Sequence, residues 1–120
     1  MKVRILLLLL GSLFALDAQA QNYVVYNGGV GVDERADAPS SGTKLVFFVK
    51  GGSYLANVKV TVKDQGGNTV VDTVTKGPWL ILDLPEGKYR VRAEVDGQAQ
   101  GGMLEVTGKS QKVGYMFKDM

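Results

Sequence analysis

Alternation of apolar and polar residues is the clearest signal along the chain. In Asn57–Lys63 every second residue is valine, and the residues between are polar. Lys88–Val95 alternates in the same way, with Tyr89 as its first apolar member. A period of two is typical of a half-buried β-strand. Lys44–Val49 and Trp79–Leu84 are apolar on both faces, which indicates central or doubly covered strands.

Turn residues separate these segments about every ten residues, and no segment has a helical period. The pattern predicts an all-β, seven-stranded antiparallel sandwich of the immunoglobulin-like or transthyretin-like type, because two half-apolar sheets bury each other. The seven predicted strands are Lys44–Val49, Asn57–Lys63, Asn68–Thr75, Trp79–Leu84, Lys88–Val95, Met103–Thr107 and Gln111–Lys118. The DGQAQGG stretch between the fifth and sixth strands is predicted to be a turn or a loose hairpin end.

The N-terminus has the pattern of a signal peptide. Two basic residues precede the apolar stretch Ile5–Leu16, and Ala18 and Ala20 form an A-x-A site before Gln21. A membrane anchor is the alternative, but a spanning helix needs about 20 apolar residues. We therefore expect cleavage between Ala20 and Gln21. The expected location is periplasmic or secreted, with no membrane span after cleavage.

Three parts of the chain follow from this pattern. Residues 1–20 are the predicted signal peptide, residues 21–43 an N-terminal arm or linker, and residues 44–120 the β-sandwich domain. The arm contains one short β-like piece, Tyr23–Tyr26, followed by glycines, mixed charges and Pro39. We predict that it extends from the sandwich or packs back on it.

The sequence LPEGKY predicts a structural corner. Leu84 ends one strand, Pro85 and Gly87 turn the chain, and Tyr89 enters the next strand facing inward. In immunoglobulin-like sandwiches a tyrosine at this place bonds to the backbone a few residues upstream. A ligand contact is the alternative role for Tyr89, and the buried hydroxyl's need for a partner favours the structural one.

Three motifs together resemble the carboxypeptidase regulatory-like domain, a transthyretin-like sandwich. They are V-x-V-x-V-x-D-x-x-G (Val58–Gly67), the turn TKGPWL (Thr75–Leu80) and L-P-x-G-x-Y-x-V (Leu84–Val91). The resemblance spans roughly Lys44–Lys118. It is nearest to small exported proteobacterial proteins with a GGVG-x-D-E arm, as in Gly28–Glu34. In metallocarboxypeptidases this domain is an accessory beside the catalytic one, so the resemblance implies no peptidase activity and no catalytic residue.

Composition limits the chemistry further. The chain has no histidine and no cysteine, which excludes Ser-His-Asp and Cys-His nucleophiles and zinc bound by its usual ligands. Without residues 1–20, Lys+Arg falls from 14 to 12 and Asp+Glu from 12 to 11, a net charge of +1. That charge is too small for a nucleic-acid footprint. We expect no enzyme activity, no cofactor and no nucleic-acid partner.

Two candidate ion or phosphate sites fail on spacing. Gly102–Ser110 has five residues between its glycines, where a phosphate loop has four. Asp33, Glu34 and Asp37 offer oxygen ligands for calcium but do not follow the EF-hand spacing. Glu94, Asp96 and Glu105 fall on predicted outward positions or turns, where acids are solvated. We therefore expect no metal site.

A candidate binding surface follows from the directions in which the side chains of two strands face. If Leu80, Leu82 and Leu84 face the core, then Trp79 and Ile81 face outward. If Val46 and Phe48 face outward on their strand as well, the four side chains form a large apolar patch. A soluble monomer rarely leaves such a patch bare. The candidate covers are the N-terminal arm with Tyr23 and Tyr26, an envelope protein partner, and a second copy of the chain. The candidate partner surface consists of Trp79, Ile81, Phe48 and Val46.

Two functions remain open. The first is a non-catalytic exported module for protein–protein interaction, or a structural accessory of the envelope. The alternative is a small-ligand or glycan-binding protein that uses Trp79 and Tyr54 as stacking platforms. A flat apolar face favours the first, and a concave pocket with convergent polar groups favours the second.

Overall fold

The computed structural model describes residues 23–119, apart from residues 37 and 40. The predicted signal peptide and its cleavage site lie outside the described residues. Within the described part, no helix combines the length and the apolar character that crossing a membrane requires.

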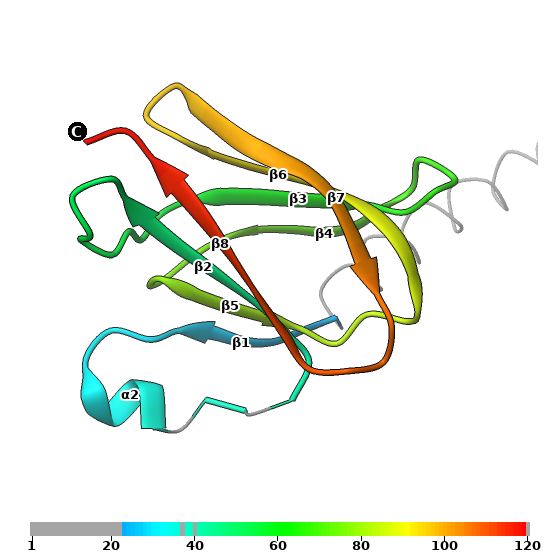
Figure 1. Ribbon diagram of the computed structural model, residues 1–120, viewed down its shortest axis with the longest axis horizontal. Coiled ribbons are helices and arrows are strands. Elements are labelled where there is room, and N and C mark those ends of the chain that lie inside the picture. Colours follow the sequence, from blue (N-terminus) through cyan, green and yellow to red (C-terminus); the bar gives the residue numbers. More distant parts are fainter. Residues whose placement is uncertain (1–22, 37, 40, 120) are drawn as a thin grey trace, which may run out of the picture.

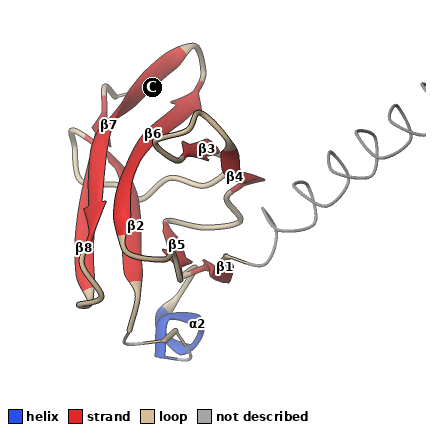
Figure 2. Cartoon of the chain, turned by 90° about the vertical axis from the view of Figure 1, so that its right-hand side faces the viewer, coloured by secondary structure: helices blue, strands red, loops and turns tan. Residues whose placement is uncertain are grey.

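Two four-stranded sheets pack face to face (Figure 1). The first sheet has the order β1-β5-β2-β8, and the second has the order β4-β3-β6-β7. The first contains β1 (Val24–Gly28), β5 (Trp79–Leu82), β2 (Thr43–Val49) and β8 (Gln111–Phe117). The second contains β4 (Thr69–Val74), β3 (Lys59–Lys63), β6 (Gly87–Val95) and β7 (Gln98–Val106). The short helix α2 (Val32–Ala36) lies beside β1 at one end of the sandwich (Figure 2).

The described part of the chain contains eight strands, so the prediction of seven is wrong. The extra strand is β1, which overlaps the β-like piece Tyr23–Tyr26 of the predicted arm and pairs antiparallel with β5 at the edge of the first sheet. Its pairing is irregular between Val24 and Tyr26, and glycines follow directly. A strand this short, with an interrupted alternation, leaves little periodic signal in the sequence.

The prediction of a wholly antiparallel sandwich is also wrong. β2 and β8 run parallel along their whole length, from the pair Thr43–Gln111 to the pair Val49–Phe117. β2 is therefore flanked by an antiparallel neighbour, β5, and a parallel one, β8. Local sequence patterns specify that a segment is extended, but they do not specify which distant segment lies beside it.

β6 and β7 form a longer hairpin than the sequence predicted. Asp96 and Gly97 both have positive φ, 48° and 77°, which makes a tight two-residue turn. β7 consequently begins at Gln98 and not at Met103. The residues Gln98–Gly102 are glutamine, alanine or glycine, with no large apolar side chain. Their pairing with β6, and not an apolar pattern, makes them a strand.

The core fills the space between the sheets. Valines of β3 alternate inward, and the rings of Phe47 and Tyr115 stack with centroids 5.5 Å apart. Burial raises the pKa of the Tyr115 hydroxyl above its ordinary value. The buried cluster consists of Leu45, Phe47, Val49, Val58, Val60, Val62, Val71, Leu80, Leu82, Leu84, Tyr89, Val91, Ala93, Leu104, Val106, Tyr115 and Phe117.

The corner before β6 is closed by Tyr89. Its hydroxyl donates a hydrogen bond of 2.6 Å to the carbonyl oxygen of Pro85, four residues upstream. Gly87, between them, has a φ of 155°, which side chains rarely adopt. Burial is the main cause that raises the pKa of Tyr89, and charges at Tyr23 and Asp64 add to it. Tyr89 therefore has a structural contact that fixes the entry of the chain into β6.

Candidate functional site

The candidate surface is the outer face of the first sheet. Strand pairing sets its side chains in rows across neighbouring strands. One row runs from Trp79 on β5 through Val46 on β2 to Gly114 on β8. The next row on the same face pairs Phe48 with Met116. The sequence predicted that Val46, Phe48 and Trp79 lie on one face, and the strand pairing places all three on the same face.

Ile81 also faces outward, but its own chain covers it. Only 1% of its surface is exposed, although it does not belong to the buried cluster between the sheets. Tyr26 lies beside it in register on β1. Gly42 packs against the Ile81 side chain, since an added Cβ on Gly42 would lie 3.3 Å from that side chain. In this arrangement Ile81 is out of reach of a partner.

The segment that follows β1 also covers part of Trp79. An added Cβ on Gly29 would lie 3.0 Å from Cγ of the indole, so the glycine backbone packs directly on the ring. The ammonium group of Lys44 lies over the same ring, 3.9 Å from its centroid. A cation at this distance is attracted by the electron-rich ring face. Trp79 is consequently half-buried, and only part of its ring remains available.

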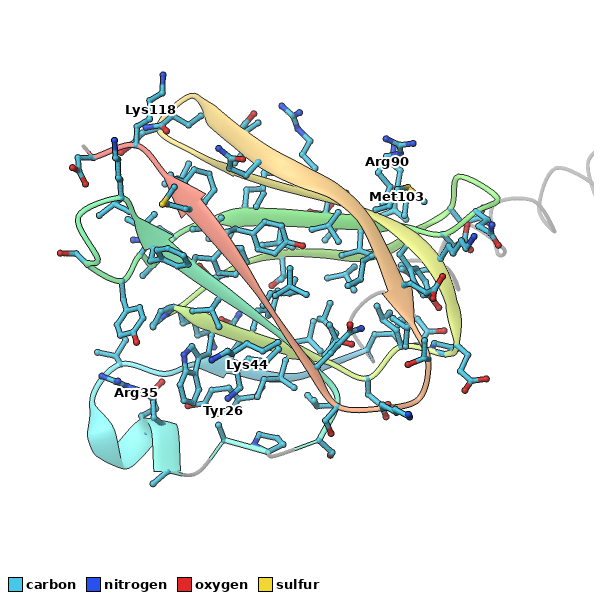
Figure 3. The ribbon with its side chains drawn as sticks, in the orientation of Figure 1. Tyr26, Arg35, Lys44, Arg90, Met103 and Lys118 are labelled. Carbon is cyan, nitrogen blue, oxygen red and sulfur yellow. The ribbon has the colours of Figure 1, made fainter. Side chains whose placement is uncertain are left out.

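Hydrogen bonds hold this covering segment in place. The Tyr26 hydroxyl donates to the carbonyl oxygen of Glu34 at 2.6 Å. The Glu34 carboxylate in turn accepts from the backbone N–H of Gly29 at 2.9 Å. On the other side of β1, the side chain of Asn27 bonds to the backbone at Val74 and Lys76. Figure 3 shows Tyr26, Arg35 and Lys44 gathered on the side of the first sheet where α2 lies.

Beyond this cover, an apolar patch remains open. Tyr54 and Met116 are 53% and 50% exposed, and Phe48 lies between them. The segment Ser53–Leu55 folds back along β2, with Val49 N–H bonded to Ser53 O and Leu55 N–H bonded to Phe47 O. Gly114 leaves room on β8 into which the Phe48 ring extends. We call Val46, Phe48, Tyr54, Trp79 and Met116 the aromatic patch.

The sequence did not predict that Met116 belongs to this patch. Its place depends on the parallel register of β8 with β2, which no local pattern specifies. Tyr54 was predicted only as a platform for ligand stacking. Because it is far from Trp79 in the sequence, its position relative to Trp79 could not be predicted. The isolated bridge between Phe48 and Tyr54 brings Tyr54 to the same face.

A shallow hollow of about 260 Å³ lies beside the patch. The Arg35 guanidinium stands over the Tyr54 ring, 5.3 Å from its centroid, and its Nε donates to the carbonyl oxygen of Gly31. Backbone of the glycine-rich segment and apolar side chains form most of the wall. The lining residues are Gly29, Val30, Gly31, Arg35, Tyr54, Leu55, Ala56 and Pro78.

Acidic side chains do not form a cluster in the described part of the chain. No three Asp or Glu residues among those described stand close enough together to hold a metal ion. The one ion pair among the same residues joins Arg92 to Glu94, at 2.8 Å on the outer face of the second sheet. The carboxylate of Glu34 is bonded to the Gly29 backbone, so it serves the covering segment.

The chain matches no known protein family model, and a search of the curated proteins finds no relative. The resemblance to the carboxypeptidase regulatory-like domain therefore still depends on the three motifs.

Proposed function

We propose that this protein is a non-catalytic interaction module that binds a protein partner through the aromatic patch. One observation carries the proposal: Tyr54 and Met116 are about half exposed, and they flank Phe48 on a paired sheet face. Large aromatic side chains held on a rigid element lose little entropy on binding, and they dominate interface energies. Met116 adds an adaptable apolar contact.

Cations lie at two borders of the aromatic patch. Lys44 and Lys112 are paired in register on β2 and β8, and Arg35 stands over Tyr54. An interface commonly has an apolar centre and a polar rim. The partner that fits this surface therefore has an apolar ridge bordered by acidic side chains.

The export pattern and the three motifs support an envelope setting for this module. We propose that residues 1–20 are a cleaved signal peptide and that the sandwich is a transthyretin-like, carboxypeptidase regulatory-like domain. The eight-stranded two-sheet architecture is compatible with that family. The motifs alone carry the family assignment.

A pull-down from envelope extract tests the interaction. The double variant Tyr54→Ser, Met116→Ser is compared with the wild type and with Met103→Ser, which removes an exposed methionine from the opposite face. We expect a specific protein to be retained by the wild type and by Met103→Ser, and lost by the double variant. Equal retention by all three baits would contradict the use of this patch.

Small-ligand binding is a second candidate, and the hollow beside Tyr54 favours it. The Arg35 guanidinium is positioned by its hydrogen bond to the Gly31 carbonyl oxygen and by the Tyr54 ring. It lies next to the apolar side chains that line the hollow. Such a site fits a small carboxylate with an apolar body. A thermal-shift screen of such compounds, repeated with Arg35→Gln, tests it. A stabilising compound whose effect disappears in Arg35→Gln would favour this candidate over the protein partner.

A further inference from the structure

The outer face of the second sheet carries a strip of cations. Lys88, Arg90 and Arg92 alternate along β6 with buried residues, so all three point outward. On the neighbouring strand β3, Lys63 lies directly opposite Arg90. All four side chains are exposed. We call Lys63, Lys88, Arg90 and Arg92 the basic strip.

The pair formed by Lys63 and Arg90 is electrostatically unfavourable. Like charges directly opposite each other on neighbouring strands destabilise a sheet. Within the described part of the chain, Arg92 is paired with Glu94, while Lys63, Lys88 and Arg90 form no ion pair. The centre of the strip is thus positive and has no internal counter-charge. An external anion that bridges Lys63 and Arg90 removes their repulsion.

An exposed apolar side chain stands beside this centre. Met103 on β7 is the direct neighbour of Arg90 and is 63% exposed. Figure 3 shows Arg90 and Met103 projecting together from the same side of the sheet. Opposite Arg92 stands Gly101, which adds no side chain to the face. Cations and one long apolar side chain therefore share an open surface.

We propose that this face docks onto the anionic phospholipid headgroups of a membrane surface. Alternate residues of a strand are about 7 Å apart, and neighbouring strands about 5 Å, so the four cations spread over a broad surface and not around one point. Such a spread fits many headgroup phosphates better than one small anion. Met103 reaches the apolar boundary beneath the headgroups, as apolar side chains of interfacial proteins do.

The acidic residues of this face lie around the centre of the strip. Glu105 is opposite Lys88, Asp72 is opposite Thr61, and Glu94 is bound to Arg92. None of them lies directly opposite Lys63 or Arg90 in the pairing of β3 with β6. The local positive charge is therefore highest at the same place as Met103. The aromatic patch is on the opposite sheet, so a membrane and a protein partner can be bound at the same time.

Vesicle sedimentation tests the proposal. The purified protein is mixed with vesicles of phosphatidylglycerol in phosphatidylcholine, or with phosphatidylcholine alone, at low and high salt. The test variant is Lys63→Gln, Arg90→Gln. The matched control is Lys50→Gln, Lys109→Gln, which removes the same charge from exposed turn residues outside the strip. All proteins keep the same N-terminus, so the comparison isolates the strip.

We expect binding to the anionic vesicles alone, weakened by salt. Each cation near an anionic surface is worth about fivefold in partitioning, so the test variant should bind roughly tenfold or more weaker. The control variant should bind within about twofold of the wild type. Met103→Ser should weaken the binding that remains at high salt, whereas Met116→Ser should not.

Three results would overturn the proposal. One is no sedimentation with anionic vesicles at low salt. Another is an equal loss in the test and control variants, which would show that net charge and not the strip governs binding. The third is capture by a soluble polyanion such as dextran sulfate without any binding to vesicles. Circular dichroism of each variant verifies that the sandwich is intact.

Discussion

The backbone of Gly29 packs on the indole ring of Trp79. An added Cβ would lie 3.0 Å from Cγ of the ring, and Gly29 has a φ of 94°. A side chain at this position therefore meets both an unfavourable backbone conformation and a steric conflict. The contact attaches the segment after β1 to the outer face of the first sheet, next to the aromatic patch.

Gly29→Ala should separate these two effects when it is compared with Gly31→Ala. Gly31 also has a positive φ, 83°, but an added Cβ there meets nothing within 4 Å. We expect Gly31→Ala to lose about 1 kcal/mol from backbone strain, and Gly29→Ala to lose about 1 kcal/mol more. Urea unfolding followed by fluorescence of Trp79, the chain's one tryptophan, measures both. Equal losses would contradict the packing of Gly29 on the ring.

Tyr89→Phe removes the hydrogen bond that closes the corner. The carbonyl oxygen of Pro85 loses its partner at 2.6 Å, so the free energy of unfolding should fall by about 1 kcal/mol. Tyr54→Phe is the control, because Tyr54 is exposed and no hydrogen bond of its hydroxyl occurs within the described residues. That control should change stability by less than about 0.5 kcal/mol. A Tyr89→Phe variant as stable as the control would argue against a structural role for the hydroxyl.

Stability should fall at alkaline pH, and Tyr115 should contribute to the fall. Burial raises its pKa in the folded state above the ordinary tyrosine value of 10.0. The folded chain then keeps a proton that the unfolded chain releases, so the contribution is complete below pH 10.0 and is lost as pH rises through the folded pKa. Tyr115→Phe should unfold with a shallower pH dependence above that value. Unfolding curves between neutral pH and pH values above 10.0 measure it, and unchanged slopes would contradict this account.

Lys63→Glu should stabilise the fold by replacing a repulsive cross-strand pair with an attractive one. The expected gain is about 0.5 kcal/mol at low salt, and it should shrink at high salt. Lys50→Glu makes the same charge change in a turn and controls for net charge. If both variants changed the unfolding temperature equally, the repulsion between Lys63 and Arg90 would not be the cause.

Much of the fold could be predicted from local patterns. Alternation across Asn57–Lys63 identified the inner valines of β3, and the two-sided apolar run at Trp79 identified β5 as a strand with neighbours on both sides. The LPEGKY sequence predicted an inward tyrosine bonded to the corner backbone, and a hydrogen bond joins Tyr89 to Pro85. These features depend on residues within about one strand of each other.

The features that were missed depend on distant pairing. The β-like piece Tyr23–Tyr26 was identified, but β1 belongs to the first sheet because β5 offers it an edge. β8 is parallel because it lies beside β2 and not beside a sequence neighbour. For the same reason the sequence placed Val46, Phe48 and Trp79 on one face but could not add Met116. The cover over Ile81 likewise could not be predicted, because it depends on where the segment from Gly28 to Gly42 lies. The sequence of that segment has no periodic pattern of apolar residues.

The central claim is that the aromatic patch binds a protein partner, and site-specific photo-crosslinking in cells tests it most directly. A photoreactive amino acid is placed at position 116, within the patch, or at position 103, on the opposite face. Both native methionines are at least half exposed, so both substitutions should be tolerated. The account predicts a discrete crosslinked protein from position 116 and none of the same mass from position 103. Without any crosslinked protein at position 116, or with the same product from both positions, the claim would be contradicted.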